Sequence, residues 1–180
     1  ANFKLGLIDE FKCKCISDVC DDIASGKLND NFPLSVWQTG SGTQTNMNLN
    51  EVISIIVNSK EGKNILHPND DVNKSQSSND TFPTAMHIAA VLEIEDHLIL
   101  KLEHLIKTFK KLEKENAGII KSGRTHLQDA TPILFSQEIS GWRSSLERDK
   151  QLINSSLKYL KEIALGGTAV GTGVNSPKFF

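Results

Sequence analysis

The sequence predicts an all-α protein whose main part is a bundle of long helices. Residues 80–116 and 136–164 carry apolar side chains at three- and four-residue steps, and both segments far exceed the length of an average helix. Helices of this length pack side by side as rods and do not fit the layers of a compact α/β fold. Three polar stretches separate the apolar-periodic segments, and we expect them to lie at breaks between helices.

The first third of the chain predicts two shorter helices. Residues 4–24 form an amphipathic pattern that ends near Gly26. Its apolar positions are Leu5, Ile8, Phe11, Cys15, Val19 and Ile23. A second helix is expected from Asn48 to Gly62, with a stripe at Val52, Ile53, Ile56 and Val57. Because those four residues are β-branched, a strand is the alternative for this segment.

The two long helices carry start and stop signals. Asp80 is placed to cap the first of them, and Pro83 is tolerated in its first turn. Its apolar stripe predicts packing against antiparallel neighbours and consists of Leu98, Leu102, Leu105, Phe109 and Leu112. In the second helix, the spacing of Trp142 favours core packing over a ligand pocket. The glycine-rich residues 166–173 follow a helix and not a strand, which favours a close-packed connector over a dinucleotide loop.

Composition excludes several classes of protein. A formal net charge of −2 argues against unspecific nucleic-acid binding, and 38% hydrophobic residues suffice for a core. The sequence has no apolar run of the roughly 18 residues that a membrane helix needs. The three cysteines lie close together on one predicted helix without a histidine nearby, so we interpret Cys13, Cys15 and Cys20 as reduced thiols. We therefore expect no metal, no membrane and no nucleic acid as partners.

The three polar stretches, residues 40–46, 67–80 and 123–129, are the candidate functional segments. They are dense in hydroxyl and amide side chains, and they include the imidazoles of His67 and His126. Neutral donors at helix starts suit a small anion, because helix N-termini carry free N–H groups and a partial positive charge. We therefore expect an enzyme site for a small carboxylate, assembled from loops on a helical scaffold.

Each stretch also has a purely structural interpretation. The first lacks the lysine and the spacing of a P-loop, and it could be a hydrogen-bonded loop that leads into a helix. In the second, residues 77–80 could merely cap a helix. In the third, His126 could move a proton near neutral pH, but it could also be a structural histidine beside an Arg–Asp pair.

Taken together, these segments resemble the class II fumarate hydratases of the fumarase/aspartase superfamily over nearly the entire chain. The matching segments are residues 32–34, 37–44, 46–48, 50–52, 67–80, 82–87, 124–130 and 166–173. The resemblance implies reversible, cofactor-free anti addition of water to fumarate, giving L-malate, as in the tricarboxylic acid cycle. Aspartases usually carry glutamine in place of His126 and another residue in place of His67, so both histidines favour water over ammonia as the group added.

The resemblance also implies roles for individual residues. His126 matches a histidine that acts in proton transfer, by activating water. Six positions match residues that bind the substrate carboxylates: Ser41, Thr43, Ser77, Ser78, Asn79 and Thr125. A second anion site near the surface matches His67, Asn69 and Asp70. The family shows a basic residue just before that second site, whereas residues 64–66 of this chain are Asn-Ile-Leu.

The resemblance further implies an amino-terminal portion of the enzyme. Residues 1–76 correspond to the end of the family's first domain and residues 77–180 to the start of its central bundle. Family members are homotetramers whose sites draw on three subunits, and their Gly-Ser-Ser-x-Met-Pro-x-Lys-x-Asn loop, with a serine as carbon base, is absent here. We therefore expect no hydratase activity from the 180 residues alone.

Two alternative functions remain open, and a cellular location is also expected. The first alternative is an aspartase-like ammonia-lyase of the same superfamily, and the second is a non-catalytic helical chain that assembles with the enzyme. We expect a cytoplasmic protein, or one of the mitochondrial matrix if the organism is a eukaryote.

Overall fold

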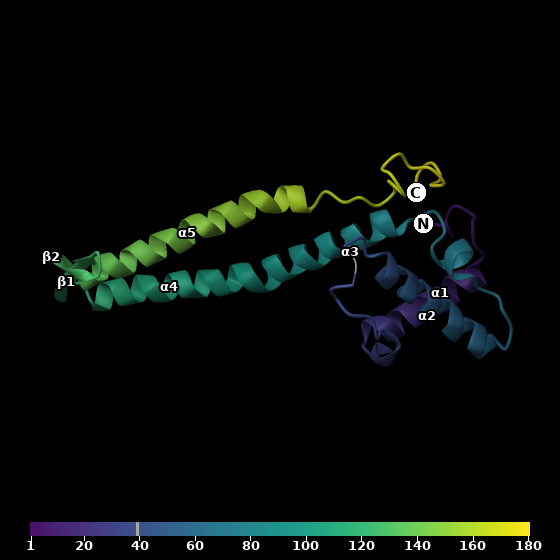
Figure 1. Ribbon diagram of the computed structural model, residues 1–180, viewed down its shortest axis with the longest axis horizontal. Coiled ribbons are helices and arrows are strands. Elements are labelled where there is room, and N and C mark those ends of the chain that lie inside the picture. Colours follow the sequence, from purple (N-terminus) through teal and green to yellow (C-terminus); the bar gives the residue numbers. More distant parts are fainter. Residues whose placement is uncertain (39) are drawn as a thin grey trace. The chain divides into compact units, whose positions relative to one another are not determined.

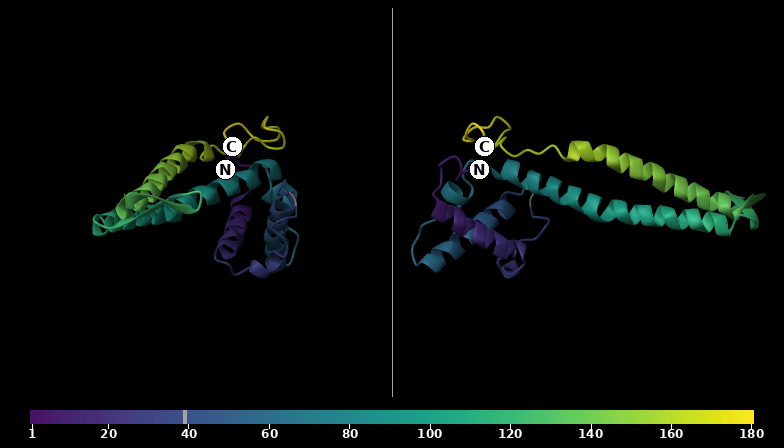
Figure 2. Two further views of the ribbon diagram at one scale, coloured as in Figure 1. Left: turned by 60° about the vertical axis from the view of Figure 1, so that its left-hand side comes forward. Right: turned by 180° about the vertical axis from the view of Figure 1, so that it is seen from behind.

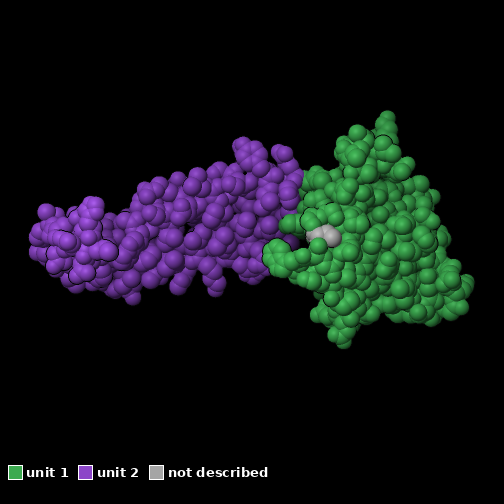
Figure 3. Space-filling view, viewed as in Figure 1, with its two compact units in different colours: residues 1–86, 163–180 green, residues 87–162 purple. Residues whose placement is uncertain are grey.

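A computed structural model describes residues 1–38 and 40–180 and divides into two compact units. Unit 1 comprises residues 1–86 and 163–180, and unit 2 comprises residues 87–162 (Figure 3). The described residues are mainly helical, which confirms the predicted all-α class. The units are defined by compactness within this chain, and the domain boundary predicted after residue 76 stays a prediction.

Unit 1 begins with two helices that share a small core. α1 spans Glu10–Ala24 and α2 spans Thr43–Glu61, and a short 3-10 turn at Asn29–Asn31 lies between them (Figure 1). The core between them is formed by Val19, Ile53, Val57 and Leu66. The structure confirms a helix over the β-branched stripe, and Ile53, Ile56 and Val57 of that stripe pack in this core at helical spacing.

Both helices start at different residues than the periodicity predicted. α1 begins at Glu10 because Asp9 caps it, its carboxylate accepting the backbone N–H of Lys12 at 2.8 Å. Residues 4–9, which were predicted as helix, form turns. α2 begins at Thr43 and not near Asn48, so most of the first polar stretch lies inside the helix.

A single helical run follows the polar segment η2, which is a π-helical turn at Pro68–Val72. The run consists of α3 at Ser78–Glu93, the π-helical segment η3 at Ile94–Leu98, and α4 at Ile99–Glu115. It confirms the long helix that the apolar spacing predicted, although the spacing gave no sign of the π-helical segment. The π-helical hydrogen bond runs from the N–H of Ile99 to the carbonyl of Ile94.

Unit 2 is built around α4 and α5 (Phe135–Leu160), which lie side by side and antiparallel (Figures 1 and 2). Ile106, Ile139 and Leu157 are buried in this unit, whereas Leu98 and Leu105 of the predicted stripe remain exposed. Trp142 packs against Phe109 with ring centroids 6.1 Å apart, yet it is 50% exposed. Trp142 is therefore only half-buried, since α4 covers only one side of α5.

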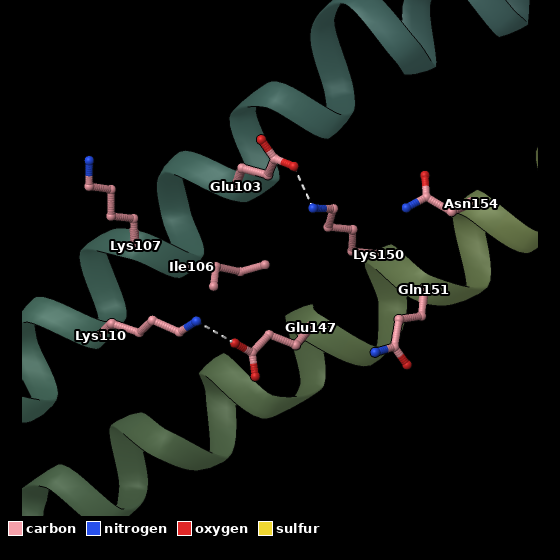
Figure 4. A pocket seen from close by; sticks show the side chains of 8 residues that line it. All are labelled: Glu103, Ile106, Lys107, Lys110, Glu147, Lys150, Gln151 and Asn154. Carbon is pink, nitrogen blue, oxygen red and sulfur yellow. Dashed lines mark hydrogen bonds and ion pairs between the residues drawn. The ribbon is translucent and has the colours of Figure 1, made fainter.

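Ion pairs supplement this thin apolar contact. A pocket of about 580 Å³ between α4 and α5 is lined by Glu103, Ile106, Lys107, Lys110, Glu147, Lys150, Gln151 and Asn154 (Figure 4). Across it, Lys110 pairs with Glu147 at 3.0 Å, and Lys150 pairs with Glu103. These two ion pairs neutralise four of the lining charges, and Lys107 leaves the pocket with one positive charge in excess.

An antiparallel hairpin joins α4 to α5 and corrects the expectation of a simple loop there. β1 (Ile120–Thr125) pairs with β2 (Gln128–Leu134), with Ile120 opposite Leu134 and Thr125 opposite Gln128. The register shifts between Ser122 and Arg124, at Gly123, where an added Cβ would lie 2.7 Å from the carbonyl oxygen of Thr131. Gly123 therefore permits the close approach of the two strands at this bulge.

None of the helices in the described part of the chain combines the length and the apolarity that a membrane crossing requires.

Candidate active site

The start of α2 carries the first group of predicted substrate-binding side chains. Gly42 precedes the helix with φ +71°, and an added Cβ would lie 2.1 Å from the ring of Phe82 in α3. Glycine is therefore required here both by the left-handed backbone and by the neighbouring ring. The flanking hydroxyls of Ser41 and Thr43 are exposed and lie 3.4 Å apart, Oγ to Oγ1. Thr39, next to this loop, lies outside the described residues.

The start of α3 carries the second group. Ser77 precedes the helix and its Oγ accepts the N–H of Asn79 at 3.2 Å, while the Ser77 N–H donates to Asp80 Oδ1 at 2.9 Å. This reciprocal pattern is a capping box in which Ser77 caps and Asp80 closes the first turn. The prediction that Asp80 itself caps the helix is therefore wrong, because the cap is Ser77, three residues earlier. The structural interpretation of residues 77–80 as helix-capping residues holds for Ser77 and Asp80.

Asp80 also holds the glycine-rich segment. Its carboxylate is 1% exposed, and Oδ2 accepts the N–H groups of Gly166 at 3.2 Å and Thr168 at 2.8 Å. Beside it, the Asn79 amide donates to the carbonyl of Ala169 at 2.8 Å. The segment forms neither helix nor strand and Thr168 is buried, as expected of a close-packed connector. The contact of this segment with Asp80 could not be inferred from the spacing of residues, because the two lie far apart in the sequence.

Asn46 links the two helix starts. Its Nδ2 donates to Ser78 Oγ at 2.8 Å and to Asn73 Oδ1 at 3.2 Å, and its Oδ1 accepts from Thr81 Oγ1 at 3.1 Å. The starts of α2 and α3 therefore adjoin, with their free N–H groups and hydroxyls in one region of unit 1. Such a region favours an anion through the partial positive charge of both helix ends.

The predicted second anion site lies in and before η2. His67 caps this turn, its Nδ1 accepting the N–H of Asp70 at 3.2 Å, and the Asp70 carboxylate lies 3.3 Å from the same nitrogen. Asn69 and Asp70 line a pocket of about 700 Å³, whereas His67 lines a different pocket of about 470 Å³. The structure thus places the three residues on one turn but divides them between two pockets.

Asn58 of α2 holds the residues that precede this turn. Residues 65 and 66 donate their backbone N–H groups to Asn58 Oδ1 at 2.8 and 2.9 Å, and Leu66 is buried in the core. Lys74 lines the larger pocket and supplies a cation that the sequence analysis did not consider. The position of this lysine, shortly after Asp70 and within the matching segment 67–80, is the sequence signal that could have revealed this cation.

Asp71 shows the electrostatics of this turn. Burial raises the pKa of its carboxyl, but the Lys12 ammonium at 2.7 Å and the backbone N–H of His67 at 2.8 Å outweigh burial and lower the pKa overall. Asp71 therefore stays ionised and ties η2 to α1.

Thr125 and His126 lie on the hairpin of unit 2. His126 (φ 50°) and Leu127 (φ 62°) are the central residues of the turn between β1 and β2, and both are left-handed as a type I′ turn requires. Asparagine and glycine usually fill such positions, and other residues cost roughly 1–2 kcal/mol each there. Strain of this kind is found preferentially at functional sites.

The hairpin tip is open to solvent. Leu127 is fully exposed, and the His126 imidazole is exposed without a hydrogen bond or ion pair to another described residue. Arg124 and Asp129 do form the expected pair, at 3.4 Å, but the pair is exposed. The structural interpretation of this stretch is therefore right about the ion pair of Arg124 and Asp129. It is wrong about His126, whose imidazole has no hydrogen-bond partner among the described residues.

The predicted site residues fall into two groups. Unit 1 holds the donors at the adjoining starts of α2 and α3, and it also holds the three residues of η2. Thr125 and His126 belong to unit 2. The roles of all these residues stay predictions.

Comparison with known proteins gives consistent matches over the whole chain. A family model described as lyase matches residues 1–180. A class II fumarate hydratase of Staphylococcus epidermidis is 56% identical over 99% of this chain and 40% of its own length. One from Helicobacter pylori is 57% identical over 98% of this chain and 39% of its own length.

Solved structures agree with these matches. A recombinant class II fumarase from Schistosoma mansoni is similar over 98% of this chain and 38% of its own, with 45% identity and a TM-score of 0.89. A fumarate lyase:delta crystallin from Brucella melitensis covers 98% of this chain and 39% of its own, with 40% identity and a TM-score of 0.86. The chain spans about 40% of the length of the curated relatives it matches.

Proposed function

Because the chain belongs to the lyase family, we propose that it supplies part of a class II fumarate hydratase. This enzyme adds water reversibly to the double bond of fumarate and gives L-malate, a step of the tricarboxylic acid cycle. The names of the relatives support the reaction, and their greater length supports an activity that belongs to a protein longer than the 180 residues.

The observation that carries the proposal is the pairing of two helix starts rich in uncharged donors. Ser41 and Thr43 at α2, and Ser77, Ser78 and Asn79 at α3, would donate hydrogen bonds to the substrate carboxylates. Addition of the water oxygen to one alkene carbon leaves the other carbon as part of an aci-carboxylate, with extra negative charge on the carboxylate oxygens, until that carbon receives a proton. Donors aimed at those oxygens stabilise this charge more than that of the substrate, which accelerates the reaction.

His126 would act on water. In the hydration direction, its neutral imidazole would accept a proton from water while the oxygen forms a bond to one alkene carbon. The other alkene carbon would then receive a proton on the opposite face, from a group outside this chain. An exposed imidazole that has no partner among the described residues and lies in a strained turn supports this role, because its nitrogens remain available to water and substrate.

We further propose a homotetramer, in which the hairpin of one subunit would complete the site of another. Exposed apolar side chains on unit 2 support assembly, because isolated helices would leave them in water. They include Ile88, Leu92, Leu98, Leu100, Leu105, Trp142, Leu152 and Tyr159. The free thiols of Cys13, Cys15 and Cys20 suit the reducing cytoplasm in which we place the enzyme.

The proposal is tested in a protein of the relatives' full length that carries these residues. We expect it to convert fumarate to malate, followed by the loss of fumarate ultraviolet absorbance, and to leave ammonia unused. His126→Asn should lower kcat by about 10²- to 10⁴-fold. His104→Asn, an exposed histidine of α4, is the matched control and should retain activity. Undiminished malate formation by His126→Asn would refute the role of His126.

A further inference from the structure

We propose that Asn46 is a positioning residue that turns the Ser78 hydroxyl proton toward the substrate carboxylate. The inference rests on the proposed function, because it assumes that Ser78 meets a carboxylate. Asn46 itself lies one turn into α2 and need not contact the substrate.

Hydrogen bonds fix the orientation of the Asn46 amide. The side chain is 9% exposed and spans three partners from the neighbouring segments. Its Nδ2 donates to Asn73 Oδ1 and Ser78 Oγ, while its Oδ1 accepts from Thr81 Oγ1, whose single proton is shared with the Ser77 carbonyl oxygen. Both ends of the amide are engaged, so its orientation is set by residues before and within α3.

The consequence for Ser78 follows from the valence of a hydroxyl. A serine Oγ has one proton to donate and two lone pairs. The Asn46 amide fills one lone pair at 2.8 Å, and the Ser78 hydroxyl donates to no other described residue. Its proton therefore remains free for an acceptor at the helix start, although Ser78 is only 9% exposed. A carboxylate is the acceptor that the helix end favours.

An acidic residue at position 46 would reverse this arrangement. In Asn46→Asp, an oxygen would replace the donor nitrogen, and the Ser78 hydroxyl would donate to Asp and not to the substrate. Loss of one hydrogen bond to a charged group predicts a rise in KM of about 10- to 100-fold. Because the carboxylate is present in both ground and transition states, kcat should change less than KM.

The matched control is Asn50→Asp. Asn50 is a buried asparagine of the same helix, 5% exposed, whose amide contacts Met47 Sδ at 3.7 Å. This substitution also buries a carboxylate in α2, so it reproduces the destabilisation without touching Ser78. Both variants should melt at lower temperature, but only Asn46→Asp should raise KM for fumarate and malate.

A cycle of milder variants keeps the test decisive if Asn46→Asp does not fold. Asn46→Ala, Ser78→Ala and the double variant are compared for KM in the full-length protein. If Asn46 acts through Ser78, the double variant should have the KM of Ser78→Ala. Multiplied effects of the two single substitutions would overturn the proposal.

The outcomes distinguish a failure of the proposed function from a failure of the positioning role of Asn46. A wild-type protein that forms no malate would refute the proposed function, and the role of Asn46 would fall with it. A wild type that forms malate, together with an Asn46→Asp variant of normal KM, would overturn the positioning role alone. Such a result would mean that the Ser78 hydroxyl already donates to residue 46.

Discussion

Gly42→Ala is the substitution for which the structure gives the sharpest expectation. Gly42 lies at the start of α2 with φ +71°, and an added Cβ would lie 2.1 Å from the Phe82 ring. This distance is far below van der Waals contact, so either the ring or the loop must move. The change would therefore disturb the approach of the loop to α3 as well as the backbone.

Two contributions add up to the expected loss of stability. The left-handed backbone costs an alanine roughly 1–2 kcal/mol. Overpacking against a ring costs about 1–3 kcal/mol. The free energy of unfolding should fall by about 2–5 kcal/mol, which for a chain of this size lowers Tm by about 4–20 °C.

Gly62→Ala separates the two contributions. Gly62 ends the same helix with φ +67°, and an added Cβ there would meet nothing within 4 Å. It should lose only the backbone contribution, about 1–2 kcal/mol. Urea denaturation followed by far-ultraviolet circular dichroism measures both variants.

The steric part is isolated by repeating Gly42→Ala in a Phe82→Ala background. Without the ring, Gly42→Ala should cost no more than Gly62→Ala, which corresponds to a coupling energy of about 1–3 kcal/mol. Equal costs of Gly42→Ala with and without the Phe82 ring would refute the steric argument.

Three further predictions concern other contacts. Asp80→Asn should lower stability by about 3 kcal/mol, because it replaces one carboxylate oxygen with an NH2 group that cannot accept the backbone N–H groups bound there. Limited proteolysis should then cleave within residues 163–180, and unchanged cleavage would contradict this. Leu127→Gly should stabilise the hairpin by about 1 kcal/mol by relieving a left-handed leucine, seen as slower amide hydrogen exchange in β1 and β2. Asp71 has a lowered pKa in the folded state, so its contribution is present above its unfolded pKa and lost as pH falls through the lower folded value. Asp71→Asn should therefore reduce stability by at most about 1 kcal/mol at neutral pH, and urea midpoints should converge with those of the wild type below about pH 4.

Periodic apolar positions predicted most helices because those positions pack against a neighbour at the same spacing. Their ends were less predictable, as α1 shows. Leu5 and Ile8 continue the apolar pattern, but Asp9 caps the helix after them and stops the pattern from extending. Capping by one carboxylate therefore outweighed the periodicity of two apolar side chains.

The hairpin was missed because its residues lack the usual signals of strands. β1 contains Gly123, β2 contains Pro132, and neither strand alternates polar and apolar residues clearly. The turn is made by His126 and Leu127, whereas Asn-Gly or Asp-Gly would have indicated a hairpin.

The candidate site was predictable in its residue types and not in its connections. Hydroxyls and amides at helix starts indicated an anion site from composition and position alone. The links made by Asn46 and Asp80 join residues far apart in sequence, and such pairs leave no local pattern. They became evident only once the segments were placed in space.

The π-helical segment η3 changes how mutations in this helix should be interpreted. Its wider turn accommodates one residue more than an α-helical turn between Glu93 and Ile99. Removing one residue from η3 would therefore leave a regular α-helix whose later side chains keep nearly the same faces. Removing one residue from α4 before Ile106 would instead rotate every later side chain by about 100° about the helix axis, and Ile106 would leave the face that packs on α5. A lost residue is therefore absorbed in η3 and not in α4.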